Sequence, residues 1–195
     1  MQYPLDLRFK LVAINPQVTV TDAAGQLVLY VKQKAFKLKE AVTVFADQEM
    51  TRPLYTFQAD RIIDFRATYH IADAQGNAVG SIRREGMRSL WKSRYEITDA
   101  SEQVVFRIQE DNPWIKVGDA ILSQFGLLGV FAGYFLNPSY TLSYANDTPA
   151  LQLKKIPSMV ERRFKLEEII NVPPQDEVLG VLAVLMMTLL ERSRG

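Results

Sequence analysis

Apolar and polar side chains alternate along most of this chain, beginning near its N-terminus. Leu5, Leu7 and Phe9 alternate with charged neighbours at positions 6, 8 and 10. The same period of two recurs in residues 66–72, 91–98, 140–144 and 161–167. This period predicts strands rather than helices. Because each strand has one apolar and one polar face, we expect an antiparallel sheet wrapped around a core.

Turn-forming residues interrupt this pattern at regular intervals. The aspartates of these turns are Asp22, Asp47, Asp73, Asp99 and Asp147, with steps of 25, 26, 26 and 48 residues. Aspartate and glycine at such places predict Asx turns and positive-φ positions between strands. Two strands per turn, together with the runs that follow residue 158, predict about twelve strands, and a sheet of that size curls or closes.

The C-terminal stretch has a different pattern. The thirteen residues from Val178 to Leu190 carry no charge, and their apolar side chains cover every side of a helix. Such a helix must be buried all round. At 1.5 Å per residue it spans roughly 20 Å, against about 30 Å for a bilayer core. We therefore expect a protein-enclosed central helix over 175–192 that threads a closed, all-β-dominated barrel.

Composition and charge narrow the function classes. The 195 residues include 23 basic and 22 acidic side chains, a net charge of +1, so no overall field attracts nucleic acid. There is no cysteine, and His70 is the single histidine, which disfavours metal sites and catalytic triads. No phosphate-binding glycine loop or GxSxG motif occurs. We expect no cofactor, no metal, no catalytic residue and no nucleic-acid partner, and His70 is expected to be an exposed strand residue.

The same observations bear on organisation and location. The length favours one domain over residues 1–195. Charged residues among the first sixteen positions exclude a signal-peptide core, which predicts a cytoplasmic protein.

A group of basic residues follows the centre of the predicted sheet. If residues 99–102 form a hairpin loop and Thr98 faces Gln103, then Arg94 falls opposite Arg107 on the polar face. Like charges directly opposite each other destabilise a sheet, and a bound anion would remove that cost. The predicted anion or lipid-headgroup site comprises Arg83, Arg84, Arg88, Lys92, Arg94 and Arg107. The alternative is a solvated face balanced by Glu85, Glu96 and Glu110.

A second apolar stretch interrupts the strand pattern. Residues 120–146 carry no charge, and helical spacing before them predicts a helical insert over 113–138. The insert is either a cover over one barrel mouth or a contact surface for a membrane or a protein partner. The residues expected to make that contact are Trp114, Phe125, Leu128, Phe131, Tyr134 and Phe135.

Five short segments carry a resemblance to a known family: ADRIIDF at 59–65, YHIADAQG at 69–76, IRR at 82–84, LWK at 90–92 and LERSRG at 190–195. They resemble the tubby C-terminal-like superfamily, and most closely its bacterial LURP-one-related-like members. The resemblance covers roughly residues 17–195 and implies a twelve-stranded barrel threaded by the C-terminal helix. It implies no settled activity, because members bind phosphoinositides, are proposed to move lipids, or have no assigned role. The cysteine-rich stretch and calcium loop of the phospholipid scramblases are absent.

Together these patterns predict a non-enzymatic module that binds anionic phospholipid headgroups or a membrane-associated protein partner. Its expected place is the cytoplasm, peripheral to the inner membrane. Two alternatives remain open: a structural or protein-interaction barrel with no lipid role, and a scramblase-like lipid mover that inserts the C-terminal helix. An enzyme is disfavoured.

Overall fold

The computed structural model describes residues 1–10, 17–32, 41–61, 67–85, 94–111, 139–158 and 161–192, with only the backbone of Arg192. Within these ranges twelve strands form one closed antiparallel barrel. The strands are β1 (Leu5–Lys10), β2 (Gln17–Thr21), β3 (Leu27–Lys32), β4 (Val42–Phe45), β5 (Pro53–Ala59), β6 (Thr68–Asp73), β7 (Ala78–Arg84), β8 (Arg94–Asp99), β9 (Val104–Glu110), β10 (Ser139–Tyr144), β11 (Pro149–Ile156) and β12 (Glu161–Glu168). Each strand pairs with its neighbours in sequence, and β1 pairs with β12 to close the ring.

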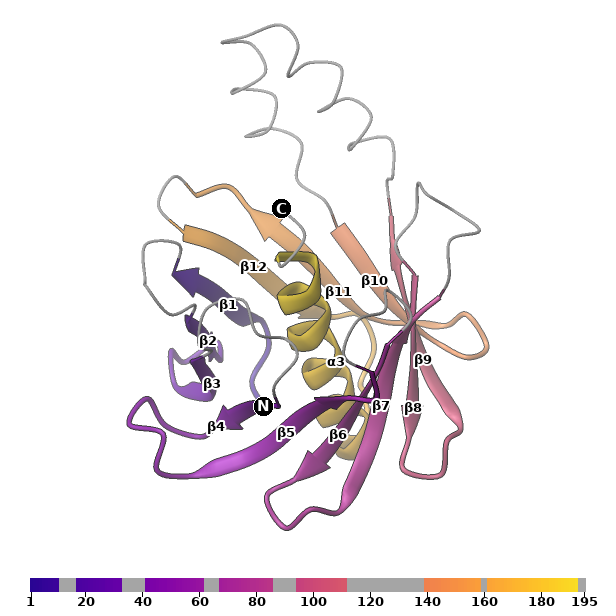
Figure 1. Cartoon of the computed structure of the whole chain (residues 1–195). Coiled ribbons are helices and arrows are strands. Elements are labelled where there is room, and N and C mark those ends of the chain that lie inside the picture. Colours follow the sequence, from indigo (N-terminus) through magenta and orange to yellow (C-terminus); the bar gives the residue numbers. More distant parts are fainter. Residues whose placement is uncertain are drawn as a thin grey trace, which may run out of the picture.

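The helix α3 (Pro174–Arg192) lies inside this ring of strands (Figure 1). Every residue from Leu179 to Leu189 is buried, and inward side chains of the strands surround them. Asp176 and Glu177 stand in the first turn, where the helix dipole favours negative charge. The predictions of a closed barrel of about twelve strands and of a protein-enclosed helix are confirmed. In the part of the chain that the structure describes, no helix combines the length and the apolar character that crossing a membrane requires.

Glycine permits the close approach of helix and wall. A Cβ on Gly80 would clash with the backbone carbonyl of Thr98 and would lie 2.9 Å from Leu179 Cδ1. On the helix itself, a Cβ on Gly180 would lie 3.0 Å from Leu151 Cδ1, which is the flexible end of a side chain. The strand glycine is therefore the more tightly constrained of the two.

Five tight turns share one design. In each, a residue with φ between 60° and 86° follows a turn closed by a backbone hydrogen bond, and a register shift in the adjoining pair marks a β-bulge. The positive-φ residues are Gly25, Met50, Gly76, Glu102 and Asp147. We call this end of the barrel, where these turns meet the N-terminus of α3, the turn mouth.

Aspartate side chains hold four of these turns. Oδ1 of Asp73 accepts from the backbone N–H groups of Gln75 and Asn77 at 2.9 and 2.8 Å, as the predicted Asx turn requires. Asp22, Asp47 and Asp99 likewise accept backbone hydrogen bonds within their own turns. Asp147 differs, because it occupies the positive-φ position and Tyr144 opens its turn.

Candidate functional site

Charged side chains point into the barrel at the end opposite to the turn mouth. Alternation places them there: Lys155 follows buried Leu153 by two residues, and Glu110 follows buried Ile108 by two residues. At this end, the charged residues of the described strands that are in phase with the inward face are Arg84 on β7, Glu110 on β9, Lys155 on β11 and Arg162 on β12. With Tyr95, Tyr140 and Glu191, they form what we call the charged mouth.

One side of the charged mouth is basic and aromatic. Lys155 pairs with Phe164 across β11 and β12, and Phe9 pairs with Arg162 across β1 and β12. The Phe9 and Phe164 rings meet edge to face, with centroids 5.6 Å apart and an interplanar angle of 76°. Two cations therefore stand beside two packed aromatic rings.

The other side is acidic and phenolic. The Tyr95 hydroxyl donates a 2.6 Å hydrogen bond to Oε1 of Glu191, near the C-terminal end of α3. Tyr140 pairs with Glu110 across β10 and β9, and Glu110 is fully buried. A carboxylate at this end of a helix opposes the helix dipole, so the Tyr95 hydrogen bond stabilises an otherwise unfavourable position.

The tyrosine pKa values show how closely these groups interact. Burial, and then the carboxylate of Glu191, raise the pKa of Tyr95 well above its usual value, while Arg84 opposes the shift. Burial, followed by Glu110 and Glu191, raises the pKa of Tyr140, and Arg84 again acts in the opposite direction. Both phenols are therefore neutral hydrogen-bond donors at physiological pH.

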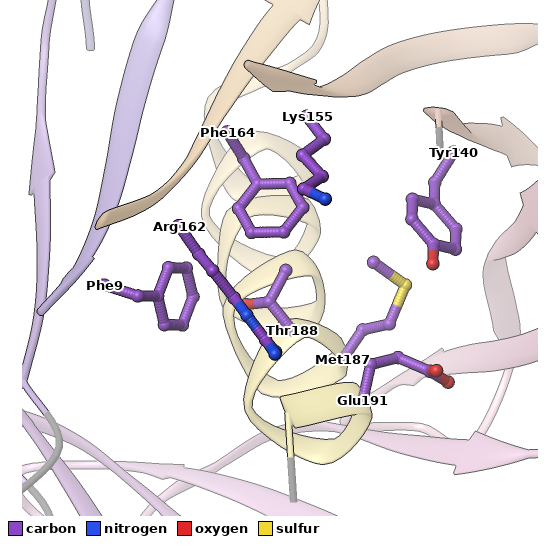
Figure 2. A pocket seen from close by; sticks show the side chains of 8 residues that line it. All are labelled: Phe9, Tyr140, Lys155, Arg162, Phe164, Met187, Thr188 and Glu191. Atoms are coloured by element: carbon purple, nitrogen blue, oxygen red, sulfur yellow. The ribbon is translucent and has the colours of Figure 1, made fainter. Parts of the chain in front are cut away.

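A pocket of about 190 Å³ opens between these two sides (Figure 2). Its lining comprises Phe9, Tyr140, Lys155, Arg162, Phe164, Met187, Thr188 and Glu191. Figure 2 shows Arg162, Phe9 and Phe164 on one side of the end of α3, and Tyr140 and Glu191 on the other. Among the described residues, no group of three or more His, Cys, Asp or Glu side chains is arranged to hold a metal ion. The arrangement can bind a small polar group that bears negative charge.

The residues of the predicted basic patch are divided between two faces. Arg83 and Arg94 lie exposed on the outer wall, where Nη2 of Arg83 forms a 3.0 Å ion pair with Oε1 of Glu96. Arg84 instead points inward to the charged mouth, in phase with buried Ile82. Arg107 lies on the outer wall and donates to the carbonyl oxygen of Ala145 at 3.0 Å. Arg88 and Lys92 fall outside the described residues.

The register prediction for this patch is wrong. Arg94 lies opposite Gln109, and Arg107 lies opposite Glu96. The bulge between Ile97 and Thr98, next to the turn with positive φ at Glu102, shifts the pairing. A cation therefore faces an anion, and the proposed repulsion between Arg94 and Arg107 does not exist.

The predicted contact insert lies outside the described residues, including Trp114, Phe125, Leu128, Phe131, Tyr134 and Phe135. The strand ends that flank it are described, and both belong to the charged mouth: β9 ends at Glu110 and β10 begins at Ser139. His70 is exposed on the outer wall, as predicted. It borders a separate polar groove of about 420 Å³ across β6 to β9.

Sequence reasoning missed Lys155, Arg162 and Glu110 as members of one site. The sequence indicated this position, because each of the three is a charged residue that lies on the same face of its strand as the apolar residues. Arg162 is two residues from Phe164, within the alternating segment 161–167, and both are therefore in phase with buried Leu166. Because burying a charge is costly, a charged residue on the inward face of a strand indicates that the barrel opens to solvent at that position.

Fold and site together define a helix-filled antiparallel β-barrel with a charged pocket at one mouth. The chain belongs to the LURP-one-related family, whose family model matches residues 27–167. The X-ray structure of a protein from Arabidopsis thaliana is similar, with a TM-score of 0.50 and 13% identity over 95% of this chain and 91% of that chain. At this identity the likeness concerns the fold. A comparison with curated proteins gives no match.

Proposed function

We propose that this chain is a non-enzymatic binding module that recognises the phosphate of anionic phospholipid headgroups at the charged mouth. The observation that carries the proposal is that Lys155 and Arg162 line one pocket of about 190 Å³ beside two aromatic rings. Lysine and arginine are the usual partners of phosphate.

The position of the pocket supports a membrane-facing role. The chain leaves the barrel after Glu110 and re-enters it at Ser139, both at the charged mouth, and the sequence between these two residues includes the uncharged run that begins at residue 120. Strand ends that lead into an apolar run of sequence, at the mouth that holds the headgroup site, fit peripheral binding to a membrane surface. The turn mouth offers no comparable pair of inward cations among its described residues.

The position of the helix α3 does not support a function in moving lipids across a membrane. The buried side chains of α3 contact the inner face of the barrel, which leaves α3 no apolar surface for a bilayer. A protein partner remains the second candidate function, and the apolar run at 120–136 is the feature that favours it.

Vesicle flotation tests the proposal. The chain is mixed at low salt with phosphatidylcholine vesicles, with and without phosphatidylglycerol. We expect binding that requires phosphatidylglycerol and weakens as salt rises, because the contacts are electrostatic. The double variant K155E/R162E should bind about tenfold or more weakly, since each basic residue near an anionic surface contributes on the order of 1 kcal/mol.

The matched control is R94E/R107E on the outer wall. It makes the same change in net charge and should bind like the unmodified chain. If the outer-wall variant alone loses binding, the headgroup site is the predicted basic patch and not the mouth. If the unmodified chain does not float with the anionic vesicles at low salt, lipid recognition is excluded.

A further inference from the structure

The charged mouth carries both signs of charge on opposite sides of one pocket. Lys155 and Arg162 supply two positive charges from β11 and β12. Across the pocket stands the carboxylate of Glu191, and among the described residues Glu110 and Arg84 lie close enough to act on the neighbouring phenols. A purely anionic ligand would gain from the first side and be repelled by the second.

We infer that the charged mouth selects a phosphate headgroup that also carries a primary ammonium, the phosphoethanolamine type. This inference rests on the proposed function, because it assigns the phosphate to the same two cations. The phosphate lies at Lys155 and Arg162, and the ammonium lies at the carboxylate of Glu191, which lines the same pocket.

The chemistry of the acidic side favours an ammonium with N–H groups. A primary ammonium has three donors, and the carboxylate of Glu191 accepts hydrogen bonds. The Tyr95 hydroxyl orients that carboxylate through a 2.6 Å bond to one oxygen, Oε1. A trimethylammonium has no N–H group and forms no such hydrogen bond.

The size of the pocket fits a headgroup and excludes acyl chains. A volume of about 190 Å³ corresponds to roughly six water molecules at about 30 Å³ each. Beneath it, Met187 and Thr188 of α3 close the way into the filled barrel. The diacyl part of a lipid therefore stays outside, where the membrane is.

Vesicles of equal net charge test recognition of the ammonium independently of recognition of the phosphate. Phosphatidylethanolamine and phosphatidylcholine are each mixed with the same fraction of phosphatidylglycerol, so both surfaces carry equal net charge. We expect the chain to bind the ethanolamine vesicles about tenfold more tightly, the effect of a hydrogen bond between charged groups. E191Q should abolish this preference and preserve binding to the choline vesicles, because the amide keeps an acceptor for Tyr95.

E49Q is the matched control, because Glu49 lies exposed in a tight turn at the other mouth and its substitution changes net charge equally. It should leave the preference intact. Equal binding to both vesicles, or a choline preference, overturns the inference and leaves the proposed function standing. Failure to bind any vesicle overturns the proposed function itself.

Soluble headgroups distinguish the source of the ligand. O-phosphoethanolamine should displace the chain from ethanolamine vesicles more effectively than phosphocholine or ethyl phosphate does. If free O-phosphoethanolamine binds the chain and no vesicle does, the ligand is a soluble amine phosphate, and recognition of a membrane lipid is overturned.

Discussion

The two mouths of this barrel are built on different principles. At the turn mouth, short connections repeat one design, with aspartate side chains bonded to the backbone of their own turn. At the charged mouth, inward side chains of both signs meet around the end of α3. Polar groups at the first mouth satisfy the local chain, whereas those at the second are shared among distant strands. Among the described residues, the pocket at the turn mouth has no cationic lining, whereas Lys155 and Arg162 line the pocket at the charged mouth.

The largest expected effect comes from the barrel wall, at the strand glycine that faces the helix joining the two mouths. Gly80→Ala places a methyl group against the carbonyl of Thr98, so the backbone of the wall must shift. We expect a loss of about 3 kcal/mol or more in the free energy of unfolding, measured by urea denaturation. Gly180→Ala is the control: the flexible end of Leu151 can move, and alanine favours a helix by about 1 kcal/mol, so stability should change little. Equal losses from both substitutions would contradict the tight contact at Gly80.

An intermediate effect is expected at the charged mouth. Tyr95→Phe removes the hydrogen bond to Glu191 and should cost about 2 kcal/mol of stability. Because the folded pKa of Tyr95 is raised, its contribution is complete below the unfolded value of about 10 and is lost as pH rises beyond it. The variant should therefore lose less stability than the unmodified chain between about pH 9 and pH 11. Urea midpoints across that range provide the measurement, and identical slopes would show that Tyr95 does not titrate with unfolding.

The smallest effect is expected at the turn mouth. Hydrogen bonds from the side chain and backbone of Asn77, and from the backbone of Gln75, hold the pKa of Asp73 below its usual value of 3.8, although desolvation acts the other way. A lowered folded pKa means that the contribution is present above the unfolded pKa and is lost as pH falls through the folded pKa. Asp73→Asn should therefore make the acid limb of the stability profile shallower below about pH 4. Thermal midpoints in buffers on both sides of that pH measure the slope, and an unchanged limb would remove Asp73 from the acid response.

The barrel and its helix could be predicted because both depend on periodicity. Alternation in residues 161–167 and uniform apolarity over 178–190 are properties of whole segments, so a single exceptional residue does not change the prediction. The pairing of Arg94 depended instead on one bulge, and a bulge reverses the conclusion for every residue beyond it. The charged mouth was missed because its charged members come from β7, β9, β11, β12 and α3, and their meeting follows only from closure of the ring.

The order of elements along the chain sets a demand on biosynthesis. The helix that fills the barrel follows every strand in sequence, so it leaves the ribosome after all of them. Until then the inward leucines, valines and phenylalanines of a nearly finished wall have no interior to pack against. Such a nascent chain is a natural client for chaperones that shield apolar surface, and ribosomes stalled before residue 174 would carry an adhesive, unfilled sheet.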